Sequence, residues 1–156
     1  MLHLRRAEED DIPFMVELLH LLFSIEEDFS FDAKKQAHAL GLLLQSSSAC
    51  LLIADLAGEK AGMASGQLII STAEGKAAVV VEDVVVTPKR QGQGIGRALL
   101  AGLEKWAEER GAERLQLLAD KKNHPALAFY SRLGWQQTAL VALRHHIRKK
   151  KITNKL

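Results

Sequence analysis

The chain has 156 residues, of which 47% are hydrophobic and 26% charged, a composition typical of one folded domain with its own core. No apolar run approaches the roughly 18 residues of a membrane-spanning helix, and the N-terminus lacks the basic and apolar stretches of a signal peptide. The lone cysteine, Cys50, excludes an internal disulfide, so we expect a cytoplasmic protein with no membrane partner.

The formal net charge of +2 hides an uneven distribution. Six Lys and Arg residues and no acid lie from Arg144 to the end, which leaves 15 basic and 19 acidic residues before it. We therefore divide the chain into a domain at residues 1–146 and a basic C-terminal tail at residues 147–156. A basic tail can bind nucleic acid. A solvated end explains the same pattern, and we expect no specific nucleic-acid partner.

The first part of the chain predicts one strand and two helices. A short strand is expected at residues 3–7, and the acidic cluster at residues 8–11 caps the first helix. Apolar residues recur at spacings of three and four over residues 12–23, which gives this helix one apolar face. Asp32 is the expected cap of a second helix.

The loop between these helices, residues 26–31, combines three acids with two phenylalanines. Such a loop suits the rim of a pocket for a cationic or amphipathic substrate. A solvated loop anchored by its two aromatic rings would give the same pattern. Glu26, Phe29 and Phe31 are therefore candidate acceptor-binding residues.

Three strands joined by short turns predict an antiparallel meander over residues 50–54, 60–71 and 77–86. A helix follows at residues 95–110 and a buried strand at residues 114–119. A strand, a helix and a strand in succession form a right-handed crossover, so these two strands should be parallel.

Pro125 opens a last helix that Gly134 ends, and residues 135–137 and 139–146 are expected to form closing strands. The resulting order is β-α-α-β-β-β-α-β-α-β-β. It predicts an α/β (α+β) single domain with a mixed, mostly antiparallel sheet and helices on both faces.

A glycine-rich elbow, Gln91-Gly92-Gln93-Gly94-Ile95-Gly96, precedes the helix at residues 95–110. Unpaired N–H groups at a helix N-terminus attract anions, above all phosphates. A P-loop would need Lys and Ser or Thr after the last glycine, but Arg97 and Ala98 follow. A dinucleotide fingerprint would need its third glycine at the place of Arg97. Both interpretations fail.

The elbow matches fully the Gln/Arg-x-x-Gly-x-Gly/Ala motif of the GCN5-related N-acetyltransferases (GNAT superfamily). A second stretch resembles that family's C-terminal pattern at Asn123, Ala126, Phe129, Tyr130, Gly134 and Trp135. The resemblance covers residues 1–146 and implies a fold of the class that the element order predicts.

This resemblance implies acetyl-CoA as cosubstrate. The pantetheine arm would pair like an extra strand where residues 84–86 diverge from the neighbouring strand, and the pyrophosphate would lie on the N–H groups of the elbow. The implied CoA-binding residues are Val84, Val85, Val86, Gln91, Gly92, Gln93, Gly94, Ile95, Gly96, Arg97, Asn123, Ala126 and Phe129. No histidine has the spacing of a metal site, and we predict no metal.

The implied chemistry is direct attack of an amine on a thioester. Glu82 is the candidate general base, because a carboxylate in a valine-rich strand is costly unless it is used or paired. A hydrogen bond to Arg6 or to a neighbouring strand would explain Glu82 as well. Asp83, on the opposite side of the strand, is a candidate acceptor-binding residue. Tyr130 matches the family's general acid, although its residue type also suits a core position.

The predicted function is an acetyl-CoA-dependent N-acetyltransferase that modifies a primary amine of a small molecule in a ternary complex. A polyamine, an aminosugar or an aminoalkyl compound would fit, and the sequence also looks similar to glucosamine-phosphate and aminoalkylphosphonate acetyltransferases. A non-catalytic acyl-CoA-binding or regulatory module remains an alternative, as does a protein lysine or N-terminal acetyltransferase. The resemblance also implies a homodimer paired through the last strands.

Overall fold

A mixed sheet lies at the centre of the computed structural model, which describes residues 1–25 and 30–147. Neighbouring strands follow the order β1-β2-β3-β4-β6, and β5 pairs with β3 beside this path. The strands are β1 (Leu2–Arg6), β2 (Ala49–Leu56), β3 (Glu59–Ser71), β4 (Lys76–Val81), β5 (Val85–Val86) and β6 (Leu115–Leu117). Helices cover both faces, as the predicted fold class requires.

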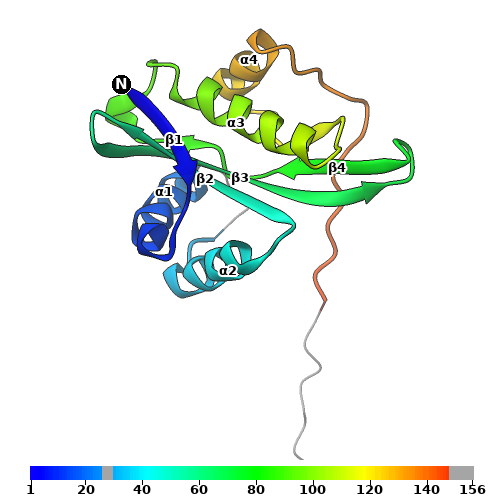
Figure 1. Ribbon diagram of the computed structural model, residues 1–156. Coiled ribbons are helices and arrows are strands. Elements are labelled where there is room, and N and C mark those ends of the chain that lie inside the picture. Colours follow the sequence, from blue (N-terminus) through cyan, green and yellow to red (C-terminus); the bar gives the residue numbers. More distant parts are fainter. Residues whose placement is uncertain (26–29, 148–156) are drawn as a thin grey trace, which may run out of the picture.

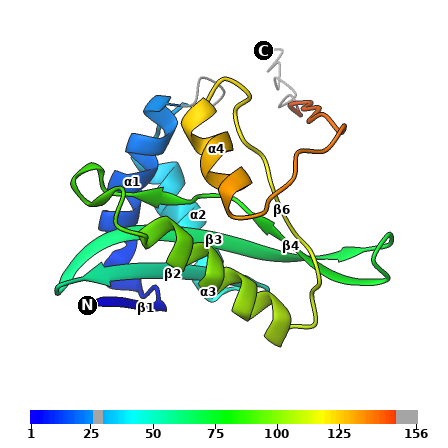
Figure 2. The ribbon, with the colours of Figure 1, turned by 90° about the horizontal axis from the view of Figure 1, so that it is seen from above.

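Helices α1 (Ile12–Ile25) and α2 (Ala33–Gln45) lie on one face of the sheet, and α3 (Ile95–Glu109) and α4 (His124–Arg132) lie on the other (Figure 1 and Figure 2). Asp32 caps α2 as predicted, whereas the acidic cluster before α1 forms a short 3-10 turn, Glu9–Asp11, with its own capping contacts. Asp11 accepts a hydrogen bond from the N–H of Glu8 (2.8 Å) just before α1, and Asp32 accepts one from the N–H of Lys34 (3.1 Å) in α2. No helix within the described ranges is long and apolar enough to cross a membrane.

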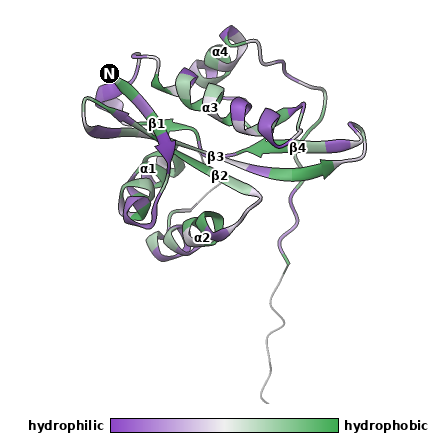
Figure 3. Ribbon diagram, in the orientation of Figure 1, coloured by the Kyte–Doolittle hydropathy of each residue, from purple (hydrophilic) through white to green (hydrophobic). Residues whose placement is uncertain are grey.

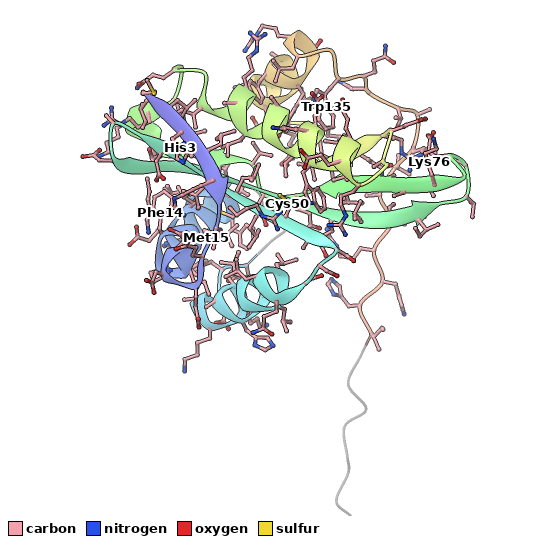
Figure 4. All side chains as sticks on the ribbon, viewed as in Figure 1. His3, Phe14, Met15, Cys50, Lys76 and Trp135 are labelled. Atoms are coloured by element: carbon pink, nitrogen blue, oxygen red, sulfur yellow. The ribbon has the colours of Figure 1, made fainter. Side chains whose placement is uncertain are left out.

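Two hydrophobic clusters fill the space between the sheet and its helices. Residues 49–54 of β2 are all buried, because alternate side chains point to opposite faces and both faces are covered. Cys50 packs into the cluster under α3, whereas Ile53 packs against α1 and α2. Figure 4 shows Met15 on the α1 side of the sheet and Trp135 on the α3 side. Figure 3 shows hydrophobic and hydrophilic residues together on each helix, as this two-sided burial requires.

The single strand predicted over residues 77–86 is wrong. β4 ends at Val81 and β5 begins at Val85, and the three residues between them belong to neither strand. On β3, Gly66 faces Val81 and Met63 faces Val85, so two residues of β3 stand opposite those three. This arrangement is a β-bulge with one extra residue, which bends the strand and ends its regular pairing.

β6 pairs with β4 in parallel, as the crossover through α3 predicted. The strand is shorter than expected, because its last pair joins Leu117 to Val81, the residue at which β4 itself ends. The bulge therefore also sets the length of the neighbouring strand.

The two closing strands predicted at residues 135–137 and 139–146 are wrong as well. The described chain after α4 forms no strand up to residue 147. Every residue from 136 to 147 is exposed, so this segment has no facing strand or helix within the described structure. The apolar residues of this segment are therefore not sufficient to make it a strand of the sheet.

A buried carboxylate ties the N-terminal segment to β3. Asp11 is 2% exposed, and its two oxygens lie 2.7 Å from Nη1 of Arg5 and 2.7 Å from Nζ of Lys60. The hydrogen bond from Arg5 is the main cause that holds the pKa of Asp11 well below its usual range. Burial of the carboxylate acts in the opposite direction and raises that pKa. The ionised carboxylate therefore stabilises the folded state.

Asp11→Asn should lower the free energy of unfolding at pH 7 by about 2–3 kcal/mol, between the values typical of exposed and buried ion pairs. The folded-state pKa of Asp11 lies below its ordinary value of 3.8. The stabilisation is therefore fully present above about pH 4 and fades as the pH falls further. Urea unfolding at pH 7 and at pH 3 should show the difference from the unaltered protein narrowing at pH 3.

Asp10→Asn is the matched control, because Asp10 is exposed in the same short segment. It should change the free energy of unfolding by less than about 0.5 kcal/mol. A difference for Asp11→Asn that stays the same at both pH values would contradict the role given to this ion pair.

Candidate active site

The glycine elbow turns the chain from β5 into α3. Gly92 and Gly94 have φ angles of 76° and 80°, in the left-handed region that glycine enters without strain. Gly94 is the N-cap of α3, and no side chain caps the helix. The N–H groups of the first turn and the helix dipole together create positive potential there. The elbow thus has the open backbone and the charge that a phosphate group requires.

α4 packs against the first turn of α3 at a position where only glycine fits without rearrangement. A Cβ atom on Gly96 would lie 3.1 Å from Cζ of Phe129. Asn123 is the N-cap of α4, and its Oδ1 accepts a hydrogen bond from the N–H of Ala126 (3.2 Å). The two motifs that are separated in the sequence therefore meet in space.

One edge of β5 has no partner strand within the described residues. On its other edge β5 pairs with Gly62 and Met63 of β3. β6 would be the next strand along, but its pairing with β4 stops at Leu117. The sheet therefore opens beyond the bulge, on the side of the elbow. The backbone groups along this edge suit an extended ligand that carries amides.

Ser65 holds the bulge and sets the positions of two carboxylates. Its carbonyl oxygen accepts a hydrogen bond from the N–H of Glu82 (3.0 Å). Its hydroxyl accepts one from the N–H of Asp83 (3.2 Å) and donates one to Oδ2 of Asp83 (3.4 Å). Glu82 is exposed. The structure shows no bond between its carboxylate and Arg6, whose Nη2 donates to the carbonyl of Ala49 (3.1 Å).

A hollow of about 150 Å³ lies between α1, α2 and the bulge. Its lining residues are Leu19, Phe23, Gln36, Ala39, Leu40, Leu43, Glu82 and Asp83. The two helices supply an apolar wall, and the bulge supplies a carboxylate end. A ligand held by that wall would present its polar group to the two acids.

Two residues of this arrangement were not predicted from the sequence. Ser65 gives only one signal, a polar residue inside the buried run of β3. Gln36 gives none, because a glutamine on an exposed helix is ordinary. Ser65 matters through its bonds to Glu82 and Asp83, which are distant in the chain, whereas the Oε1 of Gln36 accepts a local hydrogen bond from the N–H of Asp32 (2.7 Å) and its side chain lines the hollow.

Tyr130 lies with α4 on the face opposite α1 and α2. Its ring centroid is 5.1 Å from that of Phe129 and 5.7 Å from that of Trp135, and it packs, half-buried, against the cluster under α3. Tyr130 is not among the residues that line the hollow. The structure thus brings Glu82 and Asp83 together at the hollow and places Tyr130 beside the elbow through Phe129.

The predicted acceptor-binding loop is described only in part. Glu26 and Phe29 lie outside the described residues. Phe31 is half-buried and stacks on His20 of α1, with ring centroids 4.2 Å apart and an interplanar angle of 19°. It does not line the hollow, so its contact is with the outer side of α1.

A family model described as "Acetyltransferase (GNAT) family" matches residues 12–135, a span that contains the elbow, the bulge and the hollow. The chain belongs to this family.

The aminoalkylphosphonate N-acetyltransferase of Salmonella typhimurium is 30% identical over 135 residues, which are 86% of this chain and 85% of that protein. The crystal structure of an aminoglycoside acetyltransferase from an uncultured soil metagenomic sample, in complex with trehalose, has a TM-score of 0.74. The two chains are 25% identical, and the matched region covers 95% of this chain and 97% of that chain.

An uncharacterized N-acetyltransferase of Methanocaldococcus jannaschii is 24% identical over 140 residues, 88% of this chain but 62% of that protein. The chain spans less than two thirds of the length of the first curated relatives it matches. What it contains is the family's acetyltransferase domain. A predicted acetyltransferase of Clostridium acetobutylicum, solved with acetyl-CoA, has a TM-score of 0.75 and is 23% identical, covering 94% of this chain and 100% of that chain. Within residues 1–25 and 30–147, no group of three His, Cys, Asp or Glu side chains is placed to hold a metal ion.

Gly94→Ala should lower the free energy of unfolding by about 1–2 kcal/mol, because an L-residue is strained in the left-handed conformation. Gly41→Ala in α2 is the matched control, since Gly41 has no neighbouring atom within 4 Å of an added Cβ and no positive φ. That change should raise stability by about 0.5–1 kcal/mol. Thermal unfolding checks both, and equal effects of the two variants would contradict the backbone constraint at the elbow.

Proposed function

We propose that the protein transfers the acetyl group of acetyl-CoA to a primary amine of a small molecule, by direct attack in a ternary complex. The observation that supports this most is the hollow, which ends in two carboxylates at the point where the sheet opens. Donor and acceptor would approach that point from opposite sides of the bulge. Such an arrangement supplies proximity and orientation, which carry much of the barrier reduction in two-substrate reactions.

In this proposal the extended arm of acetyl-CoA pairs with the free edge of β5, and its pyrophosphate lies on the N–H groups at the start of α3. Glycines with positive φ keep side chains away from that backbone. α4 closes the site from the other side. The residues assigned to the donor are Val84, Val85, Val86, Gln91, Gly92, Gln93, Gly94, Ile95, Gly96, Arg97, Asn123, Ala126 and Phe129.

Glu82 is the proposed general base. An alkylammonium ion has a pKa of about 10.4, so most of the acceptor is protonated at neutral pH and must lose a proton before it attacks. The carboxylate of Glu82 is exposed and lines the end of the hollow, which supports transfer of that proton to it through a water molecule. Asp83 beside it would hold the ammonium ion before the proton leaves.

Tyr130 is the proposed general acid. The nitrogen lone pair attacks the thioester carbonyl carbon, the C–S bond breaks, and the departing CoA sulfur takes a proton from the phenol. The ring of Tyr130 is held between Phe129 and Trp135, and Phe129 contacts the first turn of α3. This packing would keep the hydroxyl group in a fixed position relative to the donor.

Glu82→Gln and Tyr130→Phe should each lower kcat by about 100-fold or more, the range expected for loss of a general base or acid. CoA affinity, measured by calorimetry, should change by less than about twofold, because neither change removes a backbone contact. Glu104→Gln on α3 is the control and should keep full kcat, since Glu104 lies away from the elbow.

The same assay separates the alternatives. CoA binding without turnover on any amine would favour the regulatory module. Turnover on a lysine peptide or a peptide N-terminus, but on no small amine, would favour a protein acetyltransferase. Full activity in both variants would contradict the assigned catalytic roles.

We also propose a homodimer. The outer edge of β6 has no partner strand among the described residues, and an open edge is a surface for pairing with another chain. Leu140 and Leu143 are 83% and 94% exposed in the segment after α4. The same segment of a second copy would cover the open edge of β6 and these two leucine side chains.

The protein should sediment as a dimer, and the double variant Leu140→Glu, Leu143→Glu should sediment as a monomer. Leu42→Glu, the same change at an exposed position of α2, should leave the dimer intact, and a monomeric unaltered protein would contradict the proposal.

The remaining sequence predictions stay proposals. A domain at residues 1–146 followed by a basic tail at residues 147–156 describes the charge pattern, and all of the tail but Ile147 lies outside the described residues. A cytoplasmic location also stays a proposal, supported by the lone cysteine, which is buried and free.

A further inference from the structure

The hollow between α1, α2 and the bulge has a lining that discriminates between classes of amine. Its wall consists of aliphatic and aromatic carbon atoms from both helices, and its polar groups are gathered at one end. The apolar residues are Leu19, Phe23, Ala39, Leu40 and Leu43. An occupant in contact with all of them would be apolar along most of its length and polar at one end.

The charge of the lining has a single sign. The charged side chains that line the hollow are those of Glu82 and Asp83, and the basic residues Lys34 and Lys35 at the start of α2 are exposed and do not line it. Among residues 1–25 and 30–147, no cationic side chain lines the hollow, so a phosphate, phosphonate or carboxylate group beside the amine would lose its hydration there and meet like charge. An anionic acceptor is therefore disfavoured.

The hydrogen-bonding capacity of the lining is small. In the part of the chain that the structure describes, the one polar side chain besides the two carboxylates that lines the hollow is the amide of Gln36. Each hydroxyl group of a sugar that is buried without a partner costs about 1–3 kcal/mol. Several such groups against an apolar wall would prevent binding, so an aminosugar is disfavoured as well.

The volume fixes the size of the apolar group. A hollow of about 150 Å³ has the size of a cavity that takes up one benzene molecule. An apolar group of about four to eight carbon atoms would fill it and leave the amine at the carboxylate end. A methylamine would leave the wall uncovered and would lose about 0.8 kcal/mol for each missing methylene group.

We propose that the acceptor is a primary amine with one compact alkyl or aryl group and no anionic group, bound with that group between α1 and α2 and its nitrogen at Glu82 and Asp83. This inference rests on the proposed function. In the transfer the protonated amine gains the acetyl group and loses two protons, one to Glu82 before the attack and one that restores the phenol of Tyr130 after that phenol has protonated the CoA sulfur, while the C–S bond of the thioester breaks.

The test compares kcat/KM for phenethylamine and isoamylamine with kcat/KM for methylamine, 2-aminoethylphosphonate, glucosamine and spermidine at saturating acetyl-CoA. The two apolar amines should exceed each of the others by at least about 10-fold, which corresponds to two or more buried methylene groups. An equal or higher kcat/KM for any of the other four would overturn the proposed acceptor class and leave the acetyltransferase function standing.

A matched pair of variants ties the preference to the hollow. Ala39→Leu adds a larger side chain at an exposed position of the lining, and Ala101→Leu makes the same change at an exposed position of α3. Ala39→Leu should raise KM for phenethylamine by about 10-fold while KM for acetyl-CoA stays the same. Ala101→Leu should change neither. An unchanged KM for phenethylamine in Ala39→Leu would overturn the assignment of the site.

Binding without turnover separates the two proposals. Calorimetry with CoA present should detect phenethylamine binding to the unaltered protein, weakened by about 10-fold in Ala39→Leu. If no amine is acetylated but this binding pattern holds, the proposed function fails and the apolar-amine site stands. If phenethylamine does not bind, the acceptor class is overturned whatever the turnover on other amines.

Discussion

One extra residue between β4 and β5 is the constraint on which the rest of the site depends. Ser65 accommodates it by bonding to the backbone of Glu82 and to both the backbone and the side chain of Asp83. β6 stops where the bulge begins, and β5 continues along β3 with its other edge open. The same irregularity therefore turns two carboxylates toward α1 and α2 and opens the sheet for an extended ligand.

Predictions that depend on neighbouring residues agree with the structure, whereas predictions that depend on residues distant in the chain do not. The elbow, the Asp32 cap of α2 and the parallel crossover follow from neighbouring residues, and all appear in the structure. The break inside residues 77–86 could not be predicted, because a run of valines looks the same whether or not a serine about eighteen positions earlier interrupts its pairing. The closing strands at residues 135–146 failed for a related reason, since β-propensity is realised only where a partner strand is available.

Some residues that line the hollow also stabilise the fold. Leu19 and Leu40 are buried core residues that hold α1 and α2 on the sheet, and both line the hollow. A change that reshapes the hollow at either position would also remove packing from the core, at a cost of about 2–5 kcal/mol for a change to alanine. Exposed lining positions such as Ala39 are free of this double role.

The contact between Gly96 and Phe129 has an evolutionary consequence. The two residues stand 33 positions apart, yet an atom added to one would press on the ring of the other at 3.1 Å. A related chain with alanine at the first position would have to shorten or tilt the second side chain, or move α4 away from α3. Among relatives of this protein, these two positions should therefore vary together, and their pairing would record how closely α4 approaches the start of α3.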